Sequence, residues 1–384
     1  MNKLKQRINK LPKDKILLGP PYITSADEKV VIEVLRSGQL SLGPKTEEFE
    51  KKFAKWIGSK FAVAVSSGTT GLHLCIRAAG IKEDDEVITS PFSFVSSVNC
   101  ILYEKAKPVF VDIDRKTFNV DVDKIEKAIT KKTKAILPVH IFGYPAEMDK
   151  INSLAKKYNL TVIEDAAEAL GAKYKSKKVG SLGNLSVFAF YPNKQMTTAE
   201  GGMITTNNKK QYLLLKSLLN QGRKLGSDWL EHNYLGYNYR MTEISAALGV
   251  SQLKKIDLFL KNRNKIASLY NSCLENNPFV KTILKNDNNH LRSWFVYVIQ
   301  LEKTINRKKL MKELTKRGIP SRAYLPSIHL QPYLKKMFGY EKRDFPVCEE
   351  TSERTLALPF YTGMDEKEIK LVCKKLIEVI KLLI

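Results

Sequence analysis

Short apolar runs alternate with helix-length segments between residues 61 and 206. The runs are four to six residues long and mostly apolar, as strands buried on both faces are. Strands of this kind, separated by helices, favour a mostly parallel sheet covered on both sides. The expected strands are Phe61–Val65, Glu86–Thr89, Pro108–Asp112, Ala135–Val139 and Thr161–Asp165, and the expected helices are Thr70–Ala79, Phe94–Tyr103, Val122–Ile129 and Met148–Tyr158.

Two more strand-like runs, Leu185–Phe190 and Gly202–Thr206, flank a polar loop and bring the expected sheet to seven strands. After residue 241 the apolar positions follow a helical spacing over a long stretch. We therefore predict an α/β protein with a large domain at residues 1–255 and a smaller α+β domain at residues 256–384. The elements expected in the second part are a helix over Met241–Leu274, a strand over Trp294–Leu301, and helices over Arg307–Arg317 and Glu366–Ile384.

Composition fits a globular chain of 384 residues that is 43% hydrophobic, and no run approaches the ~20 apolar residues of a membrane span. Residues 1–15 are basic but lack the apolar centre of a secretory signal, so we expect a short surface segment. The five cysteines are scattered and show no C-x-x-C spacing, which favours neither a disulfide framework nor a metal site and suits the cytoplasm. They are Cys75, Cys100, Cys273, Cys348 and Cys373.

The formal net charge of +24 raises the question of a nucleic-acid partner. The positive charges are mostly lysines spread along the whole chain, and no helix-turn-helix, zinc-finger or RNA-binding signature accompanies them. We therefore expect no nucleic-acid partner, although a lysine-rich surface could attract an anionic substrate or membrane face.

A first candidate site is the segment Ser66–Gly71 (SSGTTG), which follows an expected strand and opens an expected helix. Backbone N–H groups at a helix start are unpaired, and the helix dipole favours an anion there. Gly68 allows a close approach of the backbone, and Thr69 and Thr70 add hydroxyl donors. This arrangement suits a phosphate group, although an ordinary Ser/Thr helix cap has the same pattern.

Two further candidates are Asp165 and Lys194. Asp165 ends an apolar strand, at the edge of a parallel sheet where ligands bind, and a carboxylate there needs a positive partner or caps the next helix. Lys194 lies in YPNKQMTTAEGG between two strands, where a partly desolvated amine can act as a nucleophile, whereas a lone loop lysine is usually solvated. Along the chain, a phosphate loop is followed by a strand-end aspartate and then by a lysine before a glycine pair. This order favours a catalytic role for Lys194.

The chain resembles fold-type-I pyridoxal-phosphate (PLP) enzymes, and among them the DegT/StrS family of nucleotide-sugar aminotransferases, over roughly residues 17 to 384. The motifs of the chain are most similar to those of perosamine-type 4-aminotransferases. The matching stretches are SSGTTGLHL, DEVITSPFSFVSS, KPVFVDID, TFNVD, ILPVHIFGYPAEMD, VIEDAAEALGA, GSLGN, FAFYPNKQMTTAEGGMITT, LGYNYRMTEISAALG, IHLQPY and LALPF.

The resemblance implies a role in cofactor binding for several residues. Lys194 would form the Schiff base with PLP and shuttle the proton, and Asp165 would face the pyridine nitrogen and keep it protonated. Phe94 would stack on the ring, or else pack in the core, and Glu168 would lie near the ring hydroxyl. The phosphate would bind at Gly68, Thr69 and Thr70. Ala189 stands where many relatives have a serine that contacts this phosphate.

The resemblance also implies contacts beyond one chain. Asn238 in GYNYR would reach the cofactor phosphate of a neighbouring subunit in a homodimer with shared active sites, unless it is a turn residue after Gly236. His329 in SIHLQPY would lie near the sugar pocket, whereas the residues alone indicate that all five histidines are structural or on the surface. Arg240 could face the substrate or serve the fold.

The function that the resemblance implies is transfer of the amino group of L-glutamate to a keto carbon, with C4 favoured, of a nucleotide-linked deoxysugar, in polysaccharide or lipopolysaccharide precursor synthesis. Some relatives are dehydratases with histidine in place of the lysine, and Lys194 excludes that branch. Two alternatives stay open: a PLP-binding regulatory protein, and a PLP enzyme that acts on amino acids.

Overall fold

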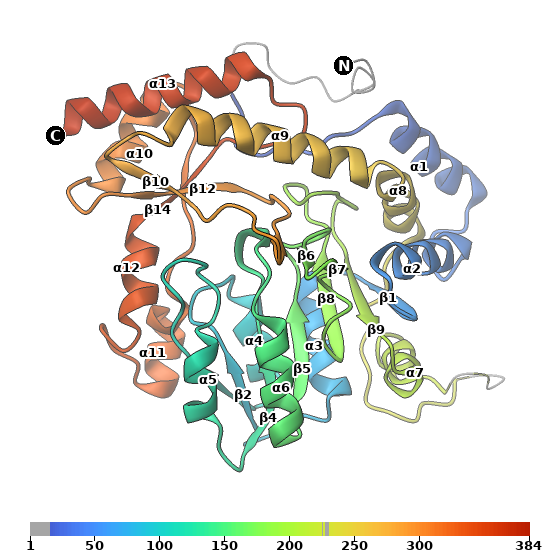
Figure 1. Ribbon diagram of the computed structural model, residues 1–384. Helices are drawn as coiled ribbons and strands as arrows, with labels where there is room; N and C mark the ends of the chain where they lie inside the picture. Colours follow the sequence, from blue (N-terminus) through green and yellow to red (C-terminus); the bar gives the residue numbers. More distant parts are fainter. Residues whose placement is uncertain (1–15, 225, 227–229) are drawn as a thin grey trace.

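The computed structural model describes residues 16–384 except 225 and 227–229, so the segment at residues 1–15 lies outside the described part. Its centre is a seven-stranded sheet of order β1-β9-β8-β5-β4-β2-β3, shown in Figure 1. The strands from β8 to β3 pair in parallel, and β9 runs antiparallel to both of its neighbours, which confirms the predicted mostly parallel sheet. The strands are β1 (Phe61–Val65), β2 (Glu86–Thr89), β3 (Lys107–Phe110), β4 (Thr133–Leu137), β5 (Thr161–Asp165), β8 (Leu185–Ala189) and β9 (Gly202–Thr206).

Helices cover both faces of this sheet because successive strand residues point to opposite sides. In β8, Val187 belongs to the apolar cluster with Leu72 and Ile76, whereas Phe188 packs with Phe49 and Phe53. The helices of this part are α1 (Ser25–Ser37), α2 (Pro44–Ile57), α3 (Gly68–Ala78), α4 (Ser96–Leu102), α5 (Val122–Ala128), α6 (Met148–Tyr158), α7 (Lys209–Leu218), α8 (Glu243–Leu253) and the 3-10 turn η1 (Ile141–Gly143).

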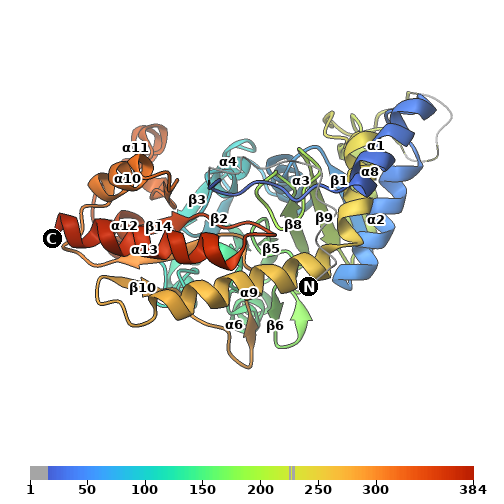
Figure 2. The ribbon, with the colours of Figure 1, turned by 90° about the horizontal axis from the view of Figure 1, so that it is seen from above.

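A second, antiparallel sheet of order β10-β12-β14-β13 comes from the C-terminal third of the chain. The long helices α9 and α13 lie side by side against it, as Figures 1 and 2 show from two directions. The boundary at residue 256 stays a prediction. The elements are α9 (Ile256–Leu274), β10 (Val280–Thr282), β12 (Tyr297–Leu301), α10 (Arg307–Lys316), β13 (Arg322–Ala323), η2 (Ile328–Leu330), α11 (Pro332–Phe338), α12 (Pro346–Arg354), β14 (Thr355–Leu358) and α13 (Glu366–Leu383).

The prediction of a single helix over residues 241–274 is wrong in one respect. The helical stretch breaks into α8 and α9 between Leu253 and Ile256. At the break, Lys255 Nζ lies 2.6 Å from the fully buried Asp27 carboxylate and 2.7 Å from Thr24 Oγ1. This ion pair joins the break to the start of α1, so a tertiary contact overrides the local helical spacing.

A small third sheet, which the apolar pattern did not indicate, connects the two parts of the chain. Its strands are β11 (His290–Leu291), β6 (Lys173–Tyr174) and β7 (Lys177–Lys178), and β11 pairs with β6. Strands of two residues carry too little alternation to be read from a sequence.

Two features are absent from the described part of the chain. No helix in the described ranges combines the length and apolar character that a membrane crossing requires. Within the same ranges, no group of three or more His, Cys, Asp or Glu side chains is arranged to hold a metal ion.

Candidate active site

A cavity of about 410 Å³ opens at the carboxyl ends of β1, β5 and β8. In sheets of this type ligands bind at that edge. The fold brings six of the candidate residues to its wall: Gly68, Thr69, Phe94, Asp165, Glu168 and Lys194. We call this space the strand-end cavity.

One end of the strand-end cavity is the N-terminus of α3. Ser67 caps the helix and accepts a bond of 3.1 Å from Thr70 N, while Thr70 Oγ1 accepts one of 3.0 Å from Ser67 N. The Thr70 side chain therefore closes the cap and is absent from the lining. Thr69 Oγ1 lies 2.7 Å from Ser96 Oγ, so two hydroxyls stand beside the first-turn N–H groups.

Gly68 is required by the close approach of α3 to β8. A Cβ atom at this position would lie 2.7 Å from Ala189 Cβ, which is tighter than side chains tolerate. The helix start and the end of β8 therefore form one tight corner, with the N–H groups of the first turn facing the cavity. Such a corner fits a phosphate group.

Asp165 forms a negative wall of the cavity and is 5% exposed. Its Oδ2 accepts a hydrogen bond of 2.6 Å from Ser97 Oγ, and its Oδ1 accepts one of 3.1 Å from Ala167 N. No basic side chain of the described residues forms an ion pair with this carboxylate. A buried carboxylate in that state suits a positively charged ring N–H of a ligand.

Lys194 extends into the cavity, and its Nζ lies 3.9 Å from the centre of the Phe295 ring. Burial lowers the pKa of this amine, and the carboxylates of Glu168 and Asp165 oppose that shift. Burial raises the pKa of Glu168, whose Oε2 accepts a hydrogen bond of 2.8 Å from Phe142 N. A buried amine that gives up its proton readily is suited to attack an aldehyde.

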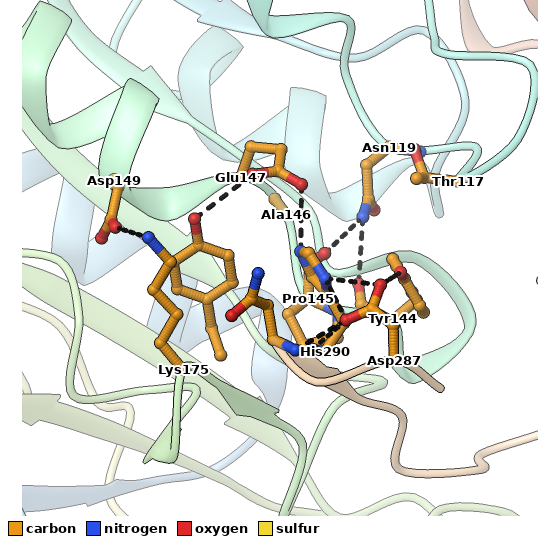
Figure 3. A network of polar contacts seen from close by, with 12 residues as sticks. Thr117, Asn119, Tyr144, Pro145, Ala146, Glu147, Asp149, Lys175, Asp287 and His290 are labelled. Atoms are coloured by element: carbon orange, nitrogen blue, oxygen red, sulfur yellow. Dashed lines mark hydrogen bonds and ion pairs between the residues drawn. The ribbon is translucent and has the colours of Figure 1, made fainter. Parts of the chain in front are cut away.

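Phe142, whose N–H donates to Glu168, lies in the loop at residues 140–146. A polar network, shown in Figure 3, fixes this loop. Asn119 accepts from Ile141 N at 2.9 Å and donates to the carbonyls of Tyr144 and Pro145 at 3.1 and 3.0 Å. The ring of His290 stacks on Tyr144 at 5.1 Å. The sequence alone does not indicate this support, because the residues that provide it lie far apart along the chain.

Aromatic side chains complete the wall. Phe94 lines the cavity with 62% of its surface exposed, and Tyr191 does so with 52% exposed. Phe295 and Tyr324 from the C-terminal part close the other side. Exposed aromatic faces at a cavity are a platform for a flat ring. Helix-start donors, a buried carboxylate, an aromatic face and a half-buried amine together fit PLP.

Three candidate residues lie away from the strand-end cavity of their own chain. Asn238 is exposed, and Arg240 donates to Asn220 Oδ1 at 2.7 Å. His329 is fully buried, with its Nε2 3.1 Å from Glu349 Oε1 and its ring 4.7 Å from that of Phe345. Their substrate and cofactor contacts remain predictions.

The segment around Asn238 is anchored by its two neighbours. The rings of Tyr237 and Tyr239 stack at 4.8 Å with an angle of 9°. Tyr237 donates to Glu104 at 3.2 Å, and the Tyr239 hydroxyl lies 3.1 Å from His73 Nδ1. Neighbouring side chains in an extended segment point to opposite sides, so this anchor turns Asn238 away from the subunit.

A mostly parallel sheet whose carboxyl-edge cavity is lined by Gly68, Asp165 and Lys194 has the arrangement of a PLP-dependent transferase of fold type I. The chain belongs to the DegT/DnrJ/EryC1/StrS aminotransferase family, whose model matches residues 21–377. It is therefore a PLP-dependent aminotransferase.

Named relatives agree with this assignment. The chain is 37% identical over 359 residues to GDP-perosamine synthase of Escherichia coli O157:H7, covering 93% of this chain and 96% of that protein. It superposes on Helicobacter pylori PseC, an aminotransferase involved in the biosynthesis of pseudoaminic acid, with a TM-score of 0.91 and 29% identity over 96% of this chain and 100% of that one. The PLP form of Spr1654 from Streptococcus pneumoniae superposes with a TM-score of 0.91 and 28% identity, covering 96% of this chain and 100% of that one.

Proposed function

We propose that this aminotransferase passes the amino group of L-glutamate to the C4 keto carbon of a nucleotide-linked deoxysugar. The observation that carries the proposed chemistry is the half-buried Lys194 amine, held with Asp165 and Glu168 in one cavity opposite the α3 N-terminus. The sugar substrate is supported by the relatives named GDP-perosamine synthase and PseC.

In this proposal each end of the strand-end cavity holds one part of PLP. The first-turn N–H groups of α3 and the hydroxyls of Thr69 and Ser96 bind the phosphate. Asp165 faces the pyridine nitrogen, and Phe94 covers one face of the ring. When bound, PLP supplies an aldehyde carbon that takes up the amino group and a ring that stores the electron pair of a broken C–H bond.

Lys194 has two tasks in the proposal. Its neutral amine would hold the cofactor at the aldehyde carbon, and burial supports this role by lowering the pKa of the amine. When it is free, the Nζ amine would take the α-proton of the amino donor and return it in the second half of the cycle. Glu168 lies within electrostatic reach of this amine, and its charge helps to hold the proton in transit.

We also propose that the enzyme works as a homodimer in the cytoplasm, with Asn238 of each subunit reaching the cofactor phosphate of the other. The anchored pair Tyr237 and Tyr239 leaves the Asn238 amide exposed and directed outward. Ala189 offers no side-chain donor to the phosphate, so an amide from the partner would supply part of what is missing. The five free cysteines suit a reducing compartment.

The experiment that tests the function separates the two half-reactions. Incubation of PLP-loaded protein with L-glutamate and no sugar should release about one equivalent of 2-oxoglutarate per active site and shift the cofactor absorbance. The aminated protein is then offered nucleotide-linked 4-keto and 3-keto deoxysugars, and the product is located by NMR. Amination at C3 alone, or use of an amino donor other than glutamate, would contradict the corresponding part of the proposal.

A further inference from the structure

Arg263, in the middle of α9, is a buried cation whose partners are neutral. Only 2% of it is exposed, and no carboxylate of the described residues forms an ion pair with it. Its guanidinium donates to Thr362 Oγ1 at 3.1 Å, Phe295 O at 3.0 Å, Trp294 O at 3.4 Å and Lys194 O at 3.3 Å.

Burying a guanidinium without a counter-ion is unfavourable, and burial lowers the pKa of Arg263 to about 10. A fork of donors in a fixed plane can hold several carbonyls in one geometry, which a lysine cannot do. The contacts of Arg263 therefore fix the relative positions of the segments that it bridges.

Two of those segments meet at the reactive amine. Arg263 holds the backbone carbonyl of Lys194 on one side and the backbone carbonyl of Phe295 on the other. The ring of Phe295 lies 3.9 Å from Lys194 Nζ. The guanidinium thus sets the distance between the amine and the aromatic ring that shields it from water.

We propose that Arg263 is a positioning residue for the reactive lysine: by clamping Lys194 and Phe295 it keeps the amine desolvated and aligned with the cofactor. This inference rests on the proposed role of Lys194. Arg263 lies outside the lining of the strand-end cavity, and it acts through the backbone that carries Lys194.

The test uses apoprotein and acetic anhydride, a small electrophile that acylates neutral amines. Arg263→Lys keeps the charge but loses the fork, and Arg263→Gln keeps two donors but loses the charge. Arg307→Lys is the matched control, because Arg307 also donates to backbone carbonyls, those of Ser352 and Thr355, and lies outside the lining of the strand-end cavity. Peptide mass spectrometry follows acylation of Lys194 against pH, and each rate is divided by its plateau at high pH to remove differences in access.

We expect the midpoint of the curve of Lys194 acylation rate against pH to move to higher pH in both Arg263 variants. The normalised acylation rate at pH 8 should then fall about threefold or more. Arg307→Lys should match the wild type. In the PLP-loaded protein the absorbance titration of the lysine-bound cofactor should move as well. Where an Arg263 variant does not accumulate, Thr362→Val removes one acceptor of the clamp and should move the midpoint in the same direction.

The proposal is overturned if folded Arg263→Lys, or Thr362→Val in its place, keeps the wild-type midpoint and absorbance titration. It is equally overturned if Arg307→Lys shifts as much as they do, since the effect would then report general loosening. Borohydride reduction of PLP-loaded wild type separates this failure from failure of the proposed function: a label on a lysine other than Lys194 removes the function itself, whereas a label on Lys194 with unmoved midpoints removes only the role of Arg263.

Discussion

Ser97 Oγ donates a hydrogen bond of 2.6 Å to Asp165 Oδ2, and this bond ties the first turn of α4 to the end of β5. Ser93 Oγ lies 2.8 Å from the same hydroxyl, so Ser93 and Ser97 of the segment FSFVSS form a short chain that ends on the carboxylate. A hydroxyl donor stabilises the charged form of a buried carboxylate. The bond therefore helps to orient the Asp165 carboxylate that would face a pyridine nitrogen.

Ser97→Ala removes this donor and leaves the cavity otherwise intact. Hydrogen bonds to charged groups contribute about 1.5–3 kcal/mol, so we expect kcat to fall about ten- to a hundredfold while PLP remains bound. Steady-state kinetics and the cofactor absorbance check this. Ser93→Ala, one step further from the carboxylate, should have a smaller effect, and an equal or larger one would contradict the proposed chain.

Asp165→Asn should bind PLP and still be a poor catalyst. An amide cannot balance a pyridinium charge, so the ring loses its proton and stores electrons poorly. Loss of a buried charge pair suggests about a hundredfold or greater decrease in kcat. The measurement is single-turnover release of 2-oxoglutarate from L-glutamate, and near-normal turnover would remove the assigned role.

The sequence predicted the main sheet because its strands are short, apolar and regularly separated. It also predicted the residues that line the cavity at strand ends and helix starts, because the topology of parallel sheets brings those ends together. Gly68, Asp165 and Lys194 meet for that reason, although nearly 130 residues separate the first from the last.

What the sequence did not predict depends on contacts between distant segments. The break between α8 and α9 follows from the contact of Lys255 with Asp27, and the N–H of Phe142 that donates to Glu168 belongs to a loop held by Asn119. The sequence did not indicate that Arg263 is buried, since one arginine in an amphipathic helix usually faces solvent. Ser97 stood inside a quoted motif, yet its direction toward Asp165 required the helix geometry of α4.

Glu168→Gln tests the electrostatics of the cavity in the apoprotein. Burial raises the folded-state pKa of Glu168 above its ordinary value of 4.5, so the folded protein holds this proton more tightly than the unfolded chain does. The wild-type carboxylate therefore lowers the free energy of unfolding as the pH rises from about 4.5 through the folded-state pKa. The glutamine variant should be more stable than the wild type at pH 8 and equal to it near pH 4 in urea titrations.

The matched control for that titration is Glu200→Gln, because Glu200 is an exposed carboxylate of the same cavity. Because this side chain is exposed, its replacement should change the free energy of unfolding at pH 8 much less than Glu168→Gln does. A glutamine variant at position 168 that is less stable than the wild type at pH 8 would show that the charge of Glu168 stabilises the fold.

Shared active sites are tested by mixing two inactive variants. Lys194→Ala and Asn238→Ala damage the same site when they come from different subunits, so a mixed dimer keeps one intact site. Random mixing in equal amounts should restore about one quarter of the wild-type activity per subunit. Lys194→Ala mixed with Asp165→Asn is the control and should restore none, because both of these residues act within their own chain.

A lack of recovery in mixtures that contain mixed dimers, with Asn238→Ala alone impaired, would contradict the shared site. Full activity of a monomeric wild type would contradict it as well. Analytical ultracentrifugation of the same samples provides the dimer content for both comparisons.

The central claim is that Lys194 is the lysine that bonds to the cofactor. Sodium borohydride reduces that bond in PLP-loaded protein and leaves the cofactor permanently attached, and peptide mass spectrometry then locates it. The account predicts one modified peptide, with the pyridoxyl group on Lys194, and no modification in Lys194→Ala. A label on any other lysine of the wild-type protein, or a PLP-loaded protein that takes up no label, would contradict the claim.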